Sequence, residues 1–153
     1  MANTYTQVYV HIVFTVRYRE AMIKEEHREH LQRFITGIVS NRKSKVLAIY
    51  CMPDHIHLFA GLNPSGSISD LVRDIKTGST QFIKEQGWFD AKFSWQEGYG
   101  CFSYSKSQIP FVARYIENQA EHHQKKTFKE EYIETLDKYE VDYDEKYLFE
   151  WFD

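Results

Sequence analysis

Two histidines lie on either side of one isoleucine in the segment MPDHIHLFA, residues 52–60. The surrounding apolar residues are typical of a β-strand, in which successive side chains point to opposite faces. His55 and His57 therefore share one face, while Ile56 and Leu58 share the other. Two neutral imidazoles at this spacing can bind one divalent ion, such as Mn, Fe or Zn. From the residues alone, half-exposed strand histidines with local hydrogen bonds are an equally good interpretation.

A nucleophile and a third ligand are suggested by a later segment with helical spacing. Between residues 107 and 126, apolar positions form one stripe that comprises Ile109, Val112, Ala113, Ile116 and Ala120. Tyr115 and Gln119 lie one turn apart on a neighbouring face, so a phenol and an amide leave the same helix edge. A phenol can act as a nucleophile, and a cation beside it can stabilise charge that develops on a phosphate.

Each of these candidates also has an ordinary structural interpretation. One tyrosine among eleven is most simply a packing aromatic, and a glutamine on a helix is most simply a surface residue. His122 and His123 are alternative ligands, and a zinc site made by the two strand histidines with His122 stays open.

Periodic segments elsewhere predict the elements that must position these residues. Strands are expected over residues 8–18, 45–52, 55–62 and 93–105, and helices over 24–40, 67–85, 107–126 and 128–139. The last strand should be irregular near Gly98 or Gly100. The order β-α-β-β-α-β is typical of the ferredoxin-like split βαβ arrangement. We therefore predict an α+β fold with an antiparallel sheet, helices on one face, and an additional C-terminal helix that carries Tyr115. The other face should be open and should display the histidine pair.

Composition limits the class of protein. A chain of 153 residues without internal repeats or a linker most simply forms one domain, residues 1–153. No apolar run is long enough to span a membrane and the N-terminus lacks signal-like features, so we expect a cytoplasmic protein without a membrane partner. Cys51 and Cys101 are then most simply reduced, packed thiols. The net charge of −3 argues against a generally basic, DNA-coating protein.

The charge is unevenly distributed along the chain. Residues 127–153 hold ten acidic residues and three lysines, whereas residues 1–126 hold sixteen basic and twelve acidic residues. The body can therefore meet a polyanion locally, beside an acidic extension that is expected to be a solvated, helix-bearing cover. The candidate DNA contacts are Arg17, Arg19, Arg73 and Lys76. For Arg73 and Lys76, which lie in the second predicted helix, a solvated charge without a DNA contact is an equally good interpretation. Candidate base-stacking aromatics are Phe59, Trp95, Tyr99 and Tyr104.

Three segments, MPDHIHLF, WQEGYGCFSYS and YIENQAEHHQ, resemble those of the small single-tyrosine HUH transposases of the 200/605 group of bacterial insertion sequences. HUH denotes His-hydrophobic-His, and the resemblance extends from FTVRYRE to YDEKYLFEW. It implies that His55 and His57 are metal ligands, that Gln119 is the third ligand, and that Tyr115 is the nucleophile. One departure is Glu20, which stands where the family's basic cluster usually continues and weakens the expected phosphate contact there.

The resemblance also implies a reaction and partners. Members of that family have a ferredoxin-like core, act as dimers, and cut single-stranded DNA at the element's ends, beside hairpins. They use a divalent metal ion, here expected to be Mg or Mn, and form a 5′-phosphotyrosine link. In some, the tyrosine helix of one subunit serves the histidine pair of the other. Two alternatives are a noncatalytic single-stranded nucleic-acid-binding protein and a metal-dependent phosphoesterase that uses water as the nucleophile.

Overall fold

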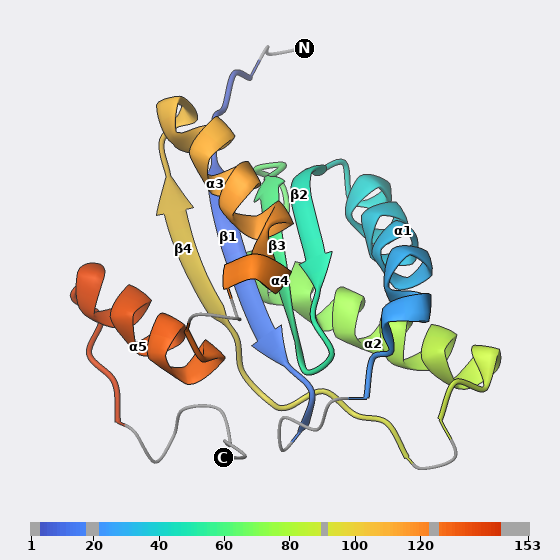
Figure 1. Ribbon diagram of the computed structural model, residues 1–153. Helices are drawn as coiled ribbons and strands as arrows, with labels where there is room; N and C mark the ends of the chain where they lie inside the picture. The colour runs from blue at the N-terminus through green and yellow to red at the C-terminus, as the bar shows by residue number, and fades with distance from the viewer. Residues whose placement is uncertain (1–3, 18–21, 90–91, 123–125, 145–153) are drawn as a thin grey trace.

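The computed structural model describes residues 4–17, 22–89, 92–122 and 126–144 (Figure 1). Within these residues, one antiparallel sheet has the strand order β2-β3-β1-β4, formed by β1 (Tyr9–Thr15), β2 (Lys45–Cys51), β3 (His55–Gly61) and β4 (Gly100–Tyr104). The helices are α1 (Glu25–Asn41), α2 (Ile68–Gln86), α3 (Ile109–Glu117), α4 (Gln119–His122) and α5 (Phe128–Lys138), and the 3₁₀ turn η2 (Lys106–Gln108) precedes α3. The predicted ferredoxin-like arrangement is confirmed.

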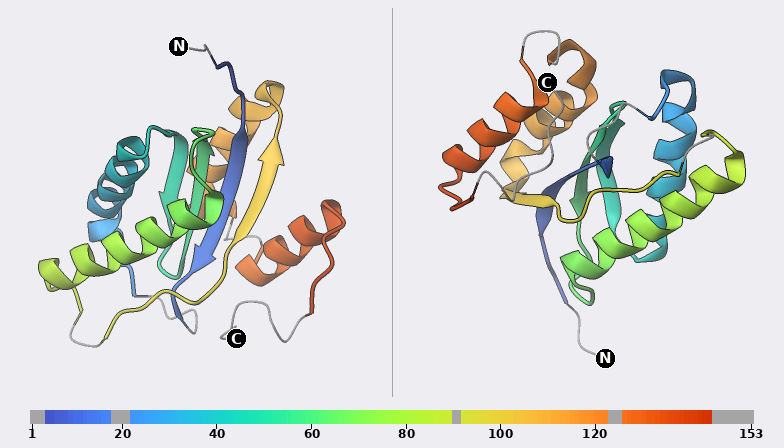
Figure 2. Two further views of the ribbon diagram at one scale, coloured as in Figure 1. Left: turned by 180° about the vertical axis from the view of Figure 1, so that it is seen from behind. Right: turned by 90° about the horizontal axis from the view of Figure 1, so that it is seen from below.

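Helices α1 and α2 cover one face of the sheet (Figures 1 and 2). Their buried residues recur at helical spacing, and Ser67 caps α2 by accepting a 3.0 Å hydrogen bond from the Asp70 N–H. The side chains beneath them form a continuous apolar cluster. We call this the aliphatic face, and on the sheet it comprises Val10, Ile12, Phe14, Ile56 and Leu58. Ile56 and Leu58 therefore pack as the sequence predicts.

The opposite face, which we call the histidine face, carries His11, His55 and His57. It is covered rather than open, so that part of the prediction is wrong. α3 packs Val112 and Ile116 against β2 and β3. α5 packs on β1 and β4 through an apolar row that comprises Phe128, Tyr132 and Leu136. The view from below in Figure 2 shows α3 and α5 together on this side of the sheet.

A glycine allows α5 to approach the sheet closely. A Cβ atom on Gly100 would lie 2.5 Å from the Tyr132 hydroxyl oxygen, which is closer than atoms of real side chains come. The absence of a side chain on β4 therefore creates the space in which α5 is seated.

Two elements, β4 and the helix that carries Tyr115, have boundaries that differ from the sequence prediction. β4 begins at Gly100 instead of residue 93, because Gly98 adopts a φ of 90° and interrupts the strand; the expected irregularity is thus confirmed. The helix predicted over 107–126 is divided at Asn118, where φ is −99° and ψ is 24°. It also begins later, since a capping box between Ser105 and Gln108 closes the preceding turn.

Several side chains proposed for other roles are part of the packing. Phe59 and Trp95 are buried, so they are wrong as candidates for base stacking in this structure. Cys51 is buried in the aliphatic cluster and Cys101 is half-buried, and both are free thiols, as expected. None of the helices in the described part of the chain is long and apolar enough to cross a membrane.

Candidate active site

β3 carries His55 and His57 to the histidine face. Their ring centroids lie 5.0 Å apart with an interplanar angle of 77°. Both side chains are buried, with 1% and 2% of their surface exposed, instead of standing on an open face. The Phe128 ring of α5 stacks on the His55 ring, with centroids 3.8 Å apart and an angle of 11°. Docking of α5 is therefore one cause of this burial.

Each of these histidines has one ring nitrogen held by a neighbour. His55 Nδ1 lies 2.6 Å from Asp54 Oδ1, and His57 Nδ1 lies 2.8 Å from His11 Nε2 on β1. Burial lowers the pKa of His11 to about 4, so its ring is neutral at neutral pH and can accept the His57 N–H. The second ring nitrogen, Nε2, is buried in both His55 and His57. It is then the atom through which each of these two rings can bind an ion.

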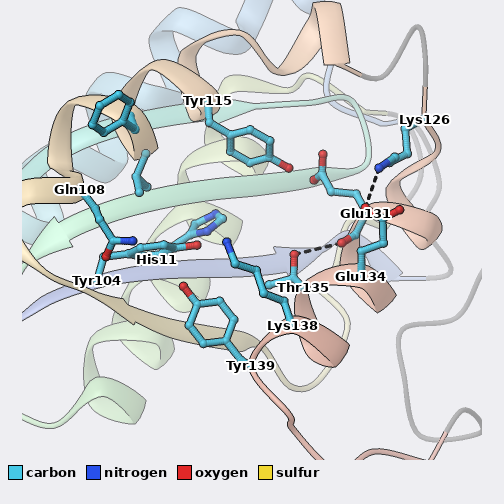
Figure 3. A pocket seen from close by; sticks show the side chains of 12 residues that line it. His11, Tyr104, Gln108, Tyr115, Lys126, Glu131, Glu134, Thr135, Lys138 and Tyr139 are labelled. Carbon is cyan, nitrogen blue, oxygen red and sulfur yellow. Dashed lines mark hydrogen bonds and ion pairs between the residues drawn. The ribbon is translucent and has the colours of Figure 1, made fainter.

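α3 brings Tyr115 against the same pair. The Tyr115 and His57 rings meet edge to face, with centroids 6.4 Å apart and an angle of 88°. The Tyr115 hydroxyl points toward Glu131 (Figure 3) and forms a hydrogen bond with its carboxylate. Burial, followed by the charge and hydrogen bond of Glu131, raises the pKa of the phenol well above its usual range, while a hydrogen bond from Gln119 opposes the shift. The hydroxyl is therefore protonated at neutral pH and shares its proton with a carboxylate.

Gln119 begins α4 and is fully buried. Its Nε2 donates a 3.2 Å hydrogen bond to the Tyr115 carbonyl oxygen, so the two predicted residues stay in contact although the helix is divided between them. Because the amide nitrogen is turned toward the backbone of α3, the amide oxygen is the atom available as a ligand.

Glu131 is a site residue that sequence reasoning missed. The sequence predicts that it belongs to a solvated acidic extension, yet only 8% of its surface is exposed. Its Oε1 lies 3.5 Å from His57 Nε2. Burial raises the pKa of this carboxyl, against the opposing hydrogen bond from Tyr115 and the positive charge of Lys126. A carboxylate whose pKa is raised is a stronger base than an ordinary one.

Signals for the missed residues were present in the sequence. Glu131 stands three residues after Phe128 and just before Tyr132, which places it beside the apolar row of a helix. His11 is a titratable residue in an otherwise apolar strand, and strand alternation puts it on the face opposite Ile12. Both were visible as polar residues within apolar patterns.

The candidate ligand set is small. Among the described residues, no three His, Cys, Asp or Glu side chains are already grouped as they would be around an ion. The predicted set therefore consists of His55 and His57 with an amide, Gln119. The side chain of His122 and the whole of His123 lie outside the described residues, so the alternative zinc site is untested.

The family model described as "Transposase IS200 like" matches residues 4–119, a range that includes the histidine pair, Tyr115 and Gln119. The chain belongs to this family. It is thus a transposase, an enzyme that acts on DNA. The matched range ends before α5, so the contacts of Phe128 and Glu131 come from a part of the transposase beyond it.

Individual relatives agree with this assignment. The ISDra2 transposase TnpA of Deinococcus radiodurans is 26% identical over 120 residues, which cover 74% of this chain and 84% of the relative. The transposase for insertion sequence element IS200 of Salmonella typhimurium is 27% identical over 127 residues, covering 79% and 82%. A solved structure of a REP-associated tyrosine transposase bound to a REP hairpin aligns with a TM-score of 0.58 and 18% identity, covering 80% of this transposase and 73% of that chain. The last likeness concerns the fold.

The predicted DNA contacts are separated from this site. Arg73 is exposed on α2 and forms ion pairs with Asp70 and Asp74. Lys76, also on α2, donates hydrogen bonds of 2.9 Å and 2.7 Å to the carbonyl oxygens of residues 96 and 98. Since α2 covers the aliphatic face, neither side chain approaches Tyr115.

The other two predicted contacts follow the first strand. Arg17 is exposed just beyond β1, where its N–H bonds the Ser94 carbonyl oxygen. Arg19 lies outside the described residues. A role for these basic residues in DNA binding stays a prediction.

Proposed function

We propose that this transposase cleaves and rejoins single-stranded DNA through a covalent bond between Tyr115 and a 5′-phosphate. The supporting observation is the contact of Tyr115 with His57, whose ring is oriented by His11. A nucleophilic hydroxyl, a carboxylate that accepts its hydrogen bond and a pair of imidazoles thus belong to one cluster.

In the proposed reaction, the Tyr115 hydroxyl oxygen attacks phosphorus. A bond forms between these two atoms, the bond from phosphorus to the 3′-oxygen breaks, and the phenol proton passes to Glu131. The protonated Glu131 then supplies the proton with which the 3′-oxygen leaves as a hydroxyl. Attack by another 3′-hydroxyl reverses these changes and joins the strands. Because one phosphate ester replaces another, no ATP is needed.

The candidate ligands fit a divalent ion, Mg²⁺ or Mn²⁺. Nε2 of each histidine in the pair and the amide oxygen of Gln119 would supply a neutral donor set, and the hydrogen bonds of Asp54 and His11 orient the two rings. When bound, the ion withdraws electron density from the non-bridging phosphate oxygens. The protein's part is to hold the two rings and the phenol in fixed relative positions.

The proposed substrate is single-stranded DNA with a hairpin at the element's ends. A structural neighbour that was solved with a REP hairpin supports this choice. A homodimer is also proposed, since joining two DNA ends requires two cleavage sites and a symmetric dimer is the smallest assembly that supplies them. In this structure Tyr115 contacts His57 of its own chain, whereas the family resemblance predicts exchange of the tyrosine helix between subunits.

Mixed dimers distinguish the two arrangements. One subunit carries His55→Ala with His57→Ala, and the other carries Tyr115→Phe. If sites are shared between chains, the mixed dimer regains one intact site and cleaves DNA. If each site lies within one chain, the mixture stays inactive despite verified subunit exchange.

The proposed function is tested with labelled single strands from the flanks of the gene, incubated with Mn²⁺ and separated by denaturing electrophoresis. We expect a labelled species that survives SDS and disappears after protease treatment. A noncatalytic binding protein would bind without metal and give no such species. A phosphoesterase would leave cut DNA with no protein attached, and either result would contradict the proposal.

A further inference from the structure

A cavity of about 590 Å³ lies between α3 and α5, directly beside the Tyr115 hydroxyl (Figure 3). His11 is at its base, and α5 supplies one side of it. The side chains that line it include Tyr104, Gln108, Phe111, Tyr115, Lys138 and Tyr139. The volume falls within the range of pockets that hold small molecules, and it suits one nucleotide unit.

Aromatic rings form much of the cavity wall. Tyr104 and Tyr139 meet edge to face, with centroids 5.8 Å apart and an angle of 84°. Phe111 adds a third ring, and 68% of its surface is exposed. An exposed phenylalanine beside a reactive hydroxyl is a poor choice for packing, but it offers a flat apolar surface on which a nucleobase can stack.

A fixed hydrogen-bond donor faces the same space. The Gln108 side-chain oxygen accepts hydrogen bonds from the Ser105 backbone N–H at 3.1 Å and from its hydroxyl at 3.2 Å. These bonds fix the amide, and its nitrogen is directed toward the cavity in Figure 3. The Lys138 ammonium group also points inward from α5 (Figure 3). Both groups can donate hydrogen bonds to the edge of a base.

The charges around the cavity favour a base over a phosphate. Lys126 and Lys138 are balanced by Glu131 and Glu134, and Lys126 is paired with Glu134. A phosphate inside would meet two carboxylates as well as the two ammonium groups. An uncharged ring with polar edges meets no such repulsion.

We propose that this cavity binds one unstacked nucleobase of the DNA strand, from a nucleotide that adjoins the scissile phosphate. The inference rests on the proposed function, because Tyr115 in the cavity wall fixes where that phosphate must lie. α5, beyond the residues that match the family model, contributes Lys138 and defines one side of the pocket. The pocket therefore gives this chain a protein-based means of holding, and selecting, a base at the cleavage point.

The test begins with wild-type protein and strands from the flanks of the gene, on which the cleaved phosphate is mapped. Two further strands each carry an abasic site, one on either side of that phosphate. Their affinities for the Tyr115→Phe protein are measured by fluorescence anisotropy at fixed salt. We expect one of the two abasic strands to bind about tenfold more weakly than the intact strand.

The same measurement is repeated after adding Phe111→Ala or Tyr139→Ala to Tyr115→Phe. Either change should reduce the tenfold difference to about twofold or less, whereas Tyr5→Ala, at an aromatic that is 89% exposed, should preserve it. The Phe111→Ala variant should fold like the parent protein, since the Phe111 side chain is mostly exposed. The inference is overturned if wild-type protein cleaves DNA but neither abasic strand binds more weakly, or if the difference persists in both pocket variants. Absence of any covalent adduct would instead overturn the proposed function, and the inference with it.

Discussion

The two faces of the sheet are both buried, yet they are built from different chemistry. Beneath α1 and α2 the sheet presents aliphatic and aromatic carbon. Beneath α3 and α5 it presents His11, Thr15, His55 and His57 among apolar side chains such as Val13, Phe59 and Phe102, together with Gln119 and Glu131 from the covering segments. Burying a polar group costs free energy unless the group is hydrogen-bonded, so the second face depends on polar contacts that the aliphatic face does not need. We therefore assign the chemistry to the histidine face and expect the aliphatic face to contribute to folding alone.

The largest effect is expected at His57, the centre of the histidine face. His57→Ala should lower adduct formation on the order of 10³-fold or more, because it removes a ligand and the ring beside Tyr115. Since His57 is buried and bonded to His11, stability should also fall by about 1–3 kcal/mol. Activity is therefore measured at a temperature where circular dichroism shows a folded protein, with Mn²⁺ affinity measured by calorimetry. The exposed His30 supplies the control, His30→Ala. Unchanged Mn²⁺ affinity in His57→Ala would contradict the assignment.

The opposite pattern is expected on the aliphatic face. Ile75 on α2 is fully buried. Ile75→Ala should therefore lower the free energy of unfolding by about 2–5 kcal/mol, through lost burial and the cavity left behind. Urea denaturation measures this loss, while the rate of adduct formation per folded molecule should stay near the wild-type value. Arg73→Ala, at an exposed position on the same helix, should change stability by less than about 0.5 kcal/mol. A rate per folded molecule that fell as far as in His57→Ala would remove the distinction between the faces.

The histidine face should also make stability depend on pH. Burial lowers the pKa of His11 from 6.5 to about 4 in the folded chain, so the unfolded chain binds a proton more readily between these values. Above pH 6.5 His11 is neutral in both states and has no effect on the pH dependence, and as the pH falls to about 4 the free energy of unfolding should fall by roughly 3 kcal/mol. Urea denaturation of wild type and His11→Leu across this range should give a flatter profile for the variant. Parallel profiles would show that His11 is not held neutral by burial.

A smaller effect on metal affinity is expected when the carboxylate of Asp54, which contacts His55 Nδ1, is replaced. Asp54→Asn keeps a hydrogen-bond acceptor but removes the charge that supports the ring, so Mn²⁺ affinity should fall about 10-fold to 100-fold. Calorimetry measures this change, and Asp70, whose side chain is half-exposed on α2 and far from the histidines, provides the control Asp70→Asn. If both variants bind Mn²⁺ equally well, Asp54 does not act through the metal site.

Most of the fold followed from the sequence, because local periodicity determines it. β1, β2, β3, α1 and α2 begin and end within three residues of the predicted boundaries, and their order defines the ferredoxin-like topology. The start of β4 could not be predicted without the positive φ of Gly98. The break at Asn118 is a change in the conformation of one residue, which helical spacing does not reveal.

Less could be predicted about what covers the histidine face. The order of helices and strands along the chain does not predict which distant segment packs on the second face of the sheet. The acidic composition of residues 127–153 suggested a solvated cover, although Phe128, Tyr132 and Leu136 at successive turns indicated a buried helix face. The near-continuous apolar run of β1, buried on both sides, was a second signal that neither face is open. Glu131 and His11 were missed for this reason.

Mapping the covalent link shows whether Tyr115 on the histidine face becomes bonded to DNA. Wild-type protein is incubated with a single strand from the gene's flanks and Mn²⁺, digested with protease, and analysed by mass spectrometry. We expect the peptide that contains Tyr115 to carry a 5′-phosphorylated nucleotide, and the Tyr115→Phe protein to bind the same strand without any adduct. An undiminished adduct in Tyr115→Phe, or a nucleotide attached to a different tyrosine such as Tyr104 or Tyr132, would contradict the assignment of Tyr115 as the nucleophile.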